Sequence, residues 1–237
     1  VGTLAFEDLW PSQGDYDMND VVVGYSTTFT VDKDNRIVAI RDVVTPLHSG
    51  GKLRSAFGYQ LDIPVTAVKG VKIENGSSTA GLEKNQDKAV VILFDDIEQA
   101  VARGPVSVEI ELDGSLSMDK VTRKSLYNPF ICVSDKGFVP GAVRKEIHLT
   151  NYPPTSLADP YPFGRNDDKS SLDKAGNPIG PYYYATSELY PFAIDLPVTD
   201  YRIPDEMVKI DVFYPDFADW VKSRGEKHKE WYKNSVK

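Results

Sequence analysis

Apolar and polar residues alternate with a period of two along most of the chain. The clearest case is VVVGYSTTFTV at 21–31, where odd-numbered residues form the more apolar face and even-numbered residues the more polar one. Alternation of this length is typical of a half-buried strand. Similar runs predict strands at FGYQLDI (57–63), VSVEIEL (106–112), VRKEIHL (143–149), FAIDL (192–196) and EMVKIDVFY (206–214). The continuous apolar run AVVILF (89–94) predicts a strand covered on both faces.

Short segments rich in Asn, Asp and Gly separate these runs. They are VDKDNRI, HSGG, ENGSS, LDGSL and SDKG, and their residues favour the positive φ angles of tight turns. The sequence Asn75-Gly-Ser is interpreted as a hairpin turn rather than a glycosylation site. No internal repeat occurs, and no helical period precedes the final segment. The pattern predicts a mainly β chain that forms one antiparallel β-sandwich domain, jelly-roll-like, over residues 1–237.

Two segments depart from the strand pattern. Residues 151–192 are rich in Pro and Tyr and show no period, which predicts a long irregular loop that is functional or laid over the core. Residues 215–233 predict a C-terminal helical segment, with Asp216 near its start and Gly225 as its stop. Apolar residues at i, i+3 and i+4 should pack it on the sheet: Phe217, Trp220 and Val221. The run LFDDIEQA (93–100) predicts a strand end that continues into a solvated turn.

The composition excludes several classes of protein. With 41% hydrophobic and 26% charged residues, it is that of an ordinary globular domain. The formal net charge of -8 argues against a nucleic-acid-binding protein, which usually carries a basic surface. No apolar run approaches the ~18 residues that a membrane-spanning helix needs. The single cysteine, Cys132, excludes a disulfide framework and a cysteine-based zinc site, and its apolar neighbours predict a small buried residue.

The stretch FEDLWPSQGDYDMNDVVVGY at 6–25 crowds acidic residues against an apolar strand. Its candidate metal ligands are Glu7, Asp8, Asp15, Asp17, Asn19 and Asp20. The last four present oxygen atoms along a tight loop, and the first two should fold back against that loop through the turn LWPSQG. The spacing is not that of an EF-hand: counted from Asp15, position six is Asp20 instead of Gly and position twelve is Ser26 instead of Glu.

Two interpretations of this stretch remain open from its spacing. One is a solvated acidic loop that stands away from the protein. The other is a bound divalent cation, which we favour because Phe6, Trp10 and Met18 interleave with the acids and should hold the loop against the core, where uncompensated carboxylates repel one another. Calcium fits better than magnesium, because many carboxylates without a phosphate substrate suit the larger ion. We therefore expect a structural Ca²⁺ site.

Two weaker candidates lie elsewhere in the chain. His148 shares the polar face of VRKEIHL, so it is either exposed or turned toward the long loop, and a hydrogen-bonded role that fixes NYPPT or RNDD is favoured over a ligand or catalytic role. Asp167 and Asp168 form a second acidic pair that could hold another ion.

Several blocks carry a resemblance to a known family. TLAFEDLWPSQGDYDMNDVVVGY is similar to the opening signature of the LruC-type domain, and further matching blocks follow in order: YNPFI, EIHLTNYPPT, FGRNDD, LYPFAIDLP and YPDFADWVKSRGEKHKEWY. Phe192 departs from the family, where Trp is commoner. The resemblance implies a bacterial cell-envelope lipoprotein, especially of Bacteroidetes, at the periplasm or the outer-membrane surface. Its membrane attachment would be a lipid anchor behind a signal segment that this sequence does not include. The family's molecular activity is not established.

No enzyme motif is present in the sequence. It contains neither a G-x-S-x-G elbow nor a phosphate-binding glycine loop, and its three histidines have no paired metal spacing. Two suitably placed carboxylates would suffice for a glycoside hydrolase, so a carbohydrate-active enzyme stays an alternative, as does a purely structural spacer. We expect a non-catalytic calcium-binding module for adhesion, or for contact with a polysaccharide or another surface protein. The aromatic residues of the loop could stack on sugars or simply cover the sheet edge.

Overall fold

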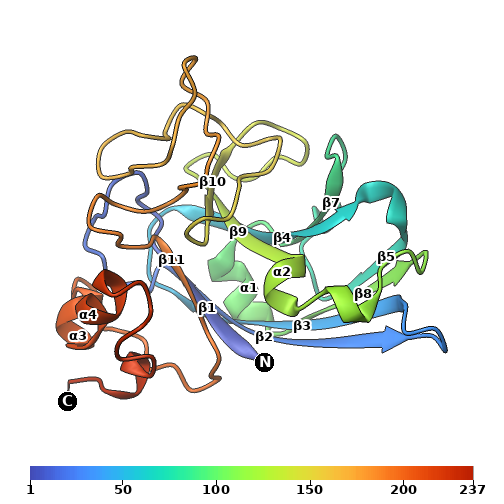
Figure 1. Ribbon diagram of the computed structural model, residues 1–237, viewed down its shortest axis with the longest axis horizontal. Coiled ribbons are helices and arrows are strands. Elements are labelled where there is room, and N and C mark those ends of the chain that lie inside the picture. Colours follow the sequence, from blue (N-terminus) through green and yellow to red (C-terminus); the bar gives the residue numbers. More distant parts are fainter. Residues whose placement is uncertain (237) are drawn as a thin grey trace.

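Two antiparallel β-sheets pack face to face in the computed structural model, which describes residues 1–236 (Figure 1). The six-stranded sheet has the order β11-β1-β2-β3-β8-β5, and the five-stranded sheet the order β10-β9-β4-β7-β6. The first consists of β1 (Gly2–Phe6), β2 (Val21–Val31), β3 (Ile37–Ser49), β5 (Val68–Glu74), β8 (Val106–Leu112) and β11 (Ala193–Leu196). The second consists of β4 (Arg54–Pro64), β6 (Gly81–Leu82), β7 (Lys88–Phe94), β9 (Tyr127–Ser134) and β10 (Lys145–His148). The predicted antiparallel sandwich is confirmed.

The helices are few and short. They are α1 (Ile97–Arg103), α2 (Arg123–Leu126), α3 (Ile210–Phe213), α4 (Phe217–Lys222) and the 3₁₀ turns η1 (Val65–Ala67), η2 (Met118–Lys120) and η3 (Trp231–Lys233). Within residues 1–236, no helix combines the length and the apolar character that crossing a bilayer requires.

The core lies between the two sheets, where the alternation predicted it. In β4 the inward residues are Phe57, Tyr59, Leu61 and Ile63, and all are buried. Phe57 stacks on Phe94 of β7 with ring centroids 5.6 Å apart and meets the edge of Phe6 at 6.2 Å. Cys132 is buried in β9, as predicted, and burial raises the pKa of its thiol.

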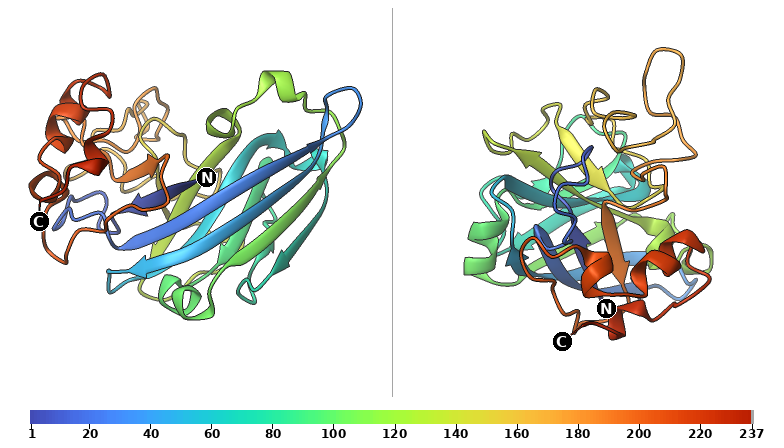
Figure 2. Two further views of the ribbon diagram at one scale, coloured as in Figure 1. Left: turned by 90° about the horizontal axis from the view of Figure 1, so that it is seen from below. Right: turned by 90° about the vertical axis from the view of Figure 1, so that its left-hand side faces the viewer.

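A second core forms on the outer face of the six-stranded sheet. Ala5 of β1 and Val22 of β2 point away from the sandwich interior and are covered by the C-terminal residues Tyr214, Phe217 and Trp231. Figure 2 shows this C-terminal segment gathered at the end of the sandwich where β1 and β11 lie. The predicted contact of Phe217 and Val221 with the sheet is confirmed because both are buried in this cluster.

Several element predictions are wrong. EMVKIDVFY is not a strand: Met207 has a positive φ, and α3 follows because Ile210 and Phe213, three residues apart, turn into the second core. LFDDIEQA does not end in a turn, because the Asp96 side chain accepts backbone N–H groups of the next residues and starts α1. VRKEIHL forms a strand only over its central residues, Lys145–His148.

The C-terminal helix is shorter than expected. It ends at Lys222 with Ser223 as its C-cap, three residues before the predicted stop at Gly225. The N–H of Gly225 still bonds back to the carbonyl of Trp220 and closes the turn after the helix. Val143, predicted to face inward, is 66% exposed because the β10 ladder begins two residues later.

The long loop is irregular, as predicted, but it is closely packed. It buries Phe163 and Tyr184 against Trp10, with both ring centroids 4.9 Å from that of the indole. The N–H of Asp167 donates to the carbonyl of Pro11. The loop therefore covers the turn that follows β1.

Candidate metal centre

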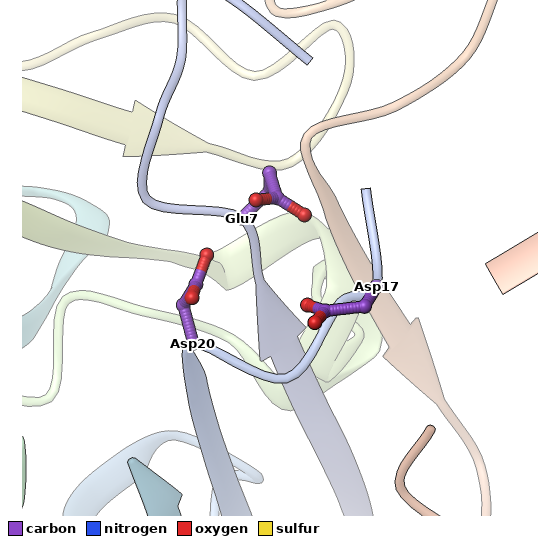
Figure 3. Close-up of side chains that lie close together, drawn as sticks. All are labelled: Glu7, Asp17 and Asp20. Atoms are coloured by element: carbon purple, nitrogen blue, oxygen red, sulfur yellow. The ribbon is translucent and has the colours of Figure 1, made fainter. Parts of the chain in front are cut away.

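Strand pairing places the first two acidic residues opposite each other. β1 pairs antiparallel with β2, and Phe6 stands opposite Val21. The residue that follows Phe6 is Glu7, and the residue that precedes Val21 is Asp20, so these two acids lie next to each other at the end of the paired strands. The connection between them curls back, and it brings Asp17 to the same place. Figure 3 shows the carboxylates of Glu7, Asp17 and Asp20 pointing toward a common space.

The carboxylates of this group are close together and buried. One oxygen atom from each of Glu7, Asp17 and Asp20 lies within 4.8 Å of the others. Glu7 and Asp17 are 0% exposed and Asp20 is 6% exposed. Like charges at such separations in a dry environment are costly unless they are protonated or neutralised. The alternative interpretation, an open and solvated loop, is thus disfavoured by the burial of these carboxylates.

The loop conformation is held by its apolar side chains. Gly14, Tyr16 and Met18 all have positive φ angles, so the chain reverses at alternate residues. For the two non-glycine residues this conformation costs on the order of 1 kcal/mol each. Tyr16 offsets that cost by stacking on Tyr190 at 5.6 Å and by donating its hydroxyl to the carbonyl of Pro191 at 2.6 Å. The residues between these positions point the other way, and the side chain of Asp17 thereby faces the cluster.

Three buried oxygen atoms of the predicted ligands have no hydrogen-bond donor. They are Glu7 Oε1, Asp8 Oδ2 and Asn19 Oδ1. The atoms beside them are partnered: the N–H of Asp8 donates to Asp20 Oδ2 at 2.8 Å, and Asn19 Nδ2 donates to the carbonyl of Pro204 at 3.1 Å. A buried acceptor left without a partner costs about 1–3 kcal/mol, and more if it is charged. A cation would supply the partner that these three atoms lack.

The pKa values of these carboxyl groups also reflect the cost of crowding them in a buried site. Burial, followed by repulsion from Asp20, raises the pKa of Glu7 to about 11. The same two causes raise the pKa of Asp8 to about 7. Burial raises the pKa of Asp17 to about 6, although the N–H of Met207 opposes the shift. Lys145 brings one positive charge near, with its Nζ 3.0 Å from the carbonyl oxygen of Trp10.

A pair of glycines that sequence analysis treated only as a turn closes one side of the cluster. An ideal Cβ on Gly50 would lie 2.2 Å from Asn19 Oδ1, and one on Gly51 would lie 2.2 Å from Asp8 Oδ2 and 3.0 Å from Asp20 Oδ1. Side chains at these positions would therefore displace two of the unpartnered oxygens. The signal in the sequence was the pair of adjacent glycines between β3 and β4.

A second group of carboxylates adjoins the first. Oxygen atoms of Asp15, Asp17 and Glu206 lie within 4.8 Å of one another. Asp15 is only partly buried and Glu206 is exposed, so this group faces solvent. Glu206 was missed by the sequence analysis, because it lies far along the chain from the acidic loop. Its segment is fixed there by the N–H of Met207, which donates to Asp17 Oδ2 at 2.9 Å.

The structure brings the predicted ligands into two adjoining groups that share Asp17. Glu7, Asp17 and Asp20 form the buried group, and Asp15 belongs to the outer group with Glu206. Asp8 belongs to neither group, although its N–H donates to Asp20, and both Asp8 and Asn19 are buried. Both clusters contain only Asp and Glu side chains, and such a set of oxygen ligands suits a hard cation and not zinc. The structure thus contains a buried acidic cluster that could hold a metal ion.

The weaker candidates have structural partners. His148 is buried and turned toward the long loop, with Nε2 2.8 Å from Glu146 and Nδ1 2.6 Å from Asn128. Glu146 also accepts the N–H of Thr155 at 2.9 Å, so the pair fixes the NYPPT segment. Burial lowers the pKa of His148.

The Asp167–Asp168 pair is divided between two tasks. Asp168 is fully buried and accepts hydrogen bonds from Gly164 and Ser170, whereas Asp167 accepts the N–H of Gln13 at 2.9 Å. These bonds within the chain account for both carboxylates without an ion.

Comparison with known proteins identifies a family but no activity. Residues 35–232 match the family described as domain of unknown function DUF4842. The matched range begins after the acidic loop and includes Gly50, Gly51 and Glu206. A crystal structure described as a "putative lipoprotein" from Bacteroides ovatus aligns with 99% of this chain and 73% of its own, with a TM-score of 0.67 and 19% identity. At that identity the likeness shows a shared fold. Comparison with curated proteins found no match.

Proposed function

Because the chain belongs to the DUF4842 family, whose function is unknown, we propose its role from the chemistry of its own acidic centre: a structural Ca²⁺ site in a non-catalytic β-sandwich module. The observation that carries the proposal is the set of three buried, unpartnered oxygens on Glu7, Asp8 and Asn19. A divalent cation would supply the missing partner and would neutralise the carboxylates around it.

The donor set favours calcium among the hard cations. Calcium takes six to eight oxygen ligands at about 2.3–2.6 Å and tolerates irregular geometry. Glu7, Asp17 and Asp20 provide carboxylates on one side, and Asp8 and Asn19 add oxygens from the neighbouring positions. Magnesium prefers fewer protein ligands and retains several waters, for which a site this buried leaves less room.

A structural role fits the way in which the site is enclosed. The acidic loop joins β1 to β2, the glycine pair closes the cluster from the β3–β4 connection, and Met207 reaches it from the C-terminal segment. An ion held by the β1–β2 loop would thus be enclosed by three separate parts of the chain. Catalytic ions keep an open position for a substrate, whereas the inner carboxylates here are nearly inaccessible.

The proposed cellular setting is the bacterial envelope. The LruC-type resemblance implies it, and the Bacteroides ovatus protein of the same fold is described as a "putative lipoprotein". We place the module in a lipid-anchored envelope protein that serves adhesion or contact with glycans. The acidic net charge of -8 supports such a role over nucleic-acid binding.

Thermal unfolding with calcium and with excess chelator tests the proposal. We expect calcium to raise the Tm by roughly 5–10 °C when free calcium is about 100-fold above its Kd. Magnesium at the same concentration should give a smaller shift. An unchanged Tm in all three conditions would overturn the proposal. Assay for reducing ends released from a polysaccharide panel tests the non-catalytic part separately.

A further inference from the structure

A groove lies between the long loop and the C-terminal helix α4. Its volume is about 350 Å³, and its walls come from residues 149–152, from residues 182–195 and from the end of α4 with the turn that follows. It is separate from the acidic centre, since none of the residues around that centre lines it.

Aromatic side chains form part of its walls. Trp220 is partly exposed there and is held from behind by Phe217 and Trp231, with ring centroids 5.7 and 5.5 Å away. Tyr152 donates its hydroxyl to the carbonyl of Lys124 at 2.8 Å, which fixes the ring at the groove wall. Tyr182 is 52% exposed. The two rings held in this way, Trp220 and Tyr152, offer faces on which sugars can stack at low entropic cost, and Tyr182 adds an exposed ring.

The charges of the groove are opposite to those of the whole chain. Lys124 stands on one wall and Arg224 on another, and within residues 1–236 neither side chain forms an ion pair. The wall also contains Asp195, but this carboxylate accepts the hydroxyl of Tyr25 at 2.7 Å and lies 3.8 Å from Arg123. The groove is therefore locally positive in a protein of net charge -8.

We infer that this groove binds an acidic oligosaccharide, such as a chain of uronic acids. Its sugar rings lie against Trp220 and Tyr182, and its carboxylates pair with Lys124 and Arg224. A neutral glycan would leave both cations without partners, and a purely acidic peptide such as poly-glutamate has no ring to stack on the aromatic faces. The inference rests on the proposed envelope role and adds a ligand class and a site to it.

The groove is suited to binding rather than to cleavage. Glycoside hydrolysis needs two carboxylates that flank the scissile bond. Among the described residues that line the groove, Asp195 is the one carboxylate, and Tyr25 and Arg123 already engage it. A sugar chain would therefore be held there without being cut.

Isothermal titration of the calcium-loaded protein with oligogalacturonate tests the inference. Neutral oligosaccharides of equal length and poly-glutamate serve as comparison probes. We expect oligogalacturonate alone to bind, with affinity reduced about tenfold or more by Lys124→Ala or Arg224→Ala and reduced by Tyr182→Ala. Lys222→Ala removes one exposed positive charge from α4 outside the groove and should bind as the parent does.

Each outcome has a defined meaning. Absence of oligogalacturonate binding would overturn the inference, as would equal binding of neutral sugars or of poly-glutamate, or equal loss in Lys222→Ala. The groove variants should keep the calcium-dependent Tm shift, because none of the substituted residues belongs to the carboxylate groups of the acidic centre. A lost sugar affinity with a retained Tm shift thus separates this inference from the calcium proposal.

Discussion

The backbone N–H of Asp8 donates a hydrogen bond of 2.8 Å to the carboxylate of Asp20, although both residues are buried and acidic. This bond joins the end of β1 to the start of β2 and places the Asp8 side chain beside that of its acceptor. The backbone N–H alone is enough to connect the two strands, so this connection does not require an acidic side chain at Asp8. The arrangement is understandable if the two carboxylates share a cation.

Glu7→Gln should leave the stability of the ion-free protein almost unchanged but weaken that of the ion-bound protein. Because burial and Asp20 raise the pKa of Glu7 to about 11, the ion-free protein holds this side chain neutral at pH 7, and glutamine copies its shape. We expect the ion-free Tm to move by about 2 °C or less, while the stabilisation by calcium is largely lost. Differential scanning calorimetry measures both. Glu109→Gln, on the exposed face of β8, should retain the full calcium response; a retained response in Glu7→Gln would contradict the assignment.

The effect of calcium on stability should grow with pH. The raised pKa values of Asp8, about 7, and Asp17, about 6, mean that the folded, ion-free chain binds protons more tightly than the unfolded chain. Their contribution to stability is therefore present near pH 4 and is lost as pH rises through these values. Calcium competes with those protons. The difference between the calcium and chelator Tm values should increase from pH 5 to pH 8, and taking the difference removes the opposite effect of His148. A Tm difference that decreases from pH 5 to pH 8 would contradict calcium binding by these carboxylates.

Uninterrupted alternation predicted several strands correctly, although it failed for EMVKIDVFY at 206–214. β2 has the predicted bounds, and the inward faces of β4 and β8 are as expected. β3 was missed because two bulges disturb its alternation, at Val38 and at Leu47, and because the buried Asp42 stands at an inward position. Asp42 is tolerated there since three hydroxyls donate to it, among them that of Tyr59.

The candidate site was predictable only as far as it is local in sequence. The six candidate ligands lie in the stretch from Glu7 to Asp20, and their density against apolar residues was visible in the sequence. Gly50, Gly51 and Glu206 reach the cluster through strand pairing and through the packing of the C-terminal segment. No local pattern encodes such contacts, so they required the three-dimensional structure.

Gly51→Ala should weaken calcium binding although it substitutes none of the proposed ligand residues. The added methyl group would lie 2.2 Å from Asp8 Oδ2 and 3.0 Å from Asp20 Oδ1, so both carboxylates must move. We expect the Kd for calcium to rise about tenfold or more, measured by titration with a calcium-selective indicator. Gly70→Ala is the matched control, because nothing lies within 4 Å of its added methyl group. Equal affinity in the two variants would show that the glycine pair is only a turn.

Trp231→Ala tests whether the C-terminal segment is an integral part of the domain. The indole is 1% exposed and contacts Tyr214 and Phe217, with ring centroids 5.1 and 4.8 Å away. Removing a buried side chain of this size should cost about 3–5 kcal/mol of unfolding free energy. Because the segment packs on β1 and β2 beside the acidic loop, we expect one cooperative transition at lower denaturant concentration and a weaker calcium response. Lys229→Ala, at an exposed position nearby, should leave both unchanged. A separate early transition with an unaltered main transition would instead mean that the segment unfolds independently of the sandwich.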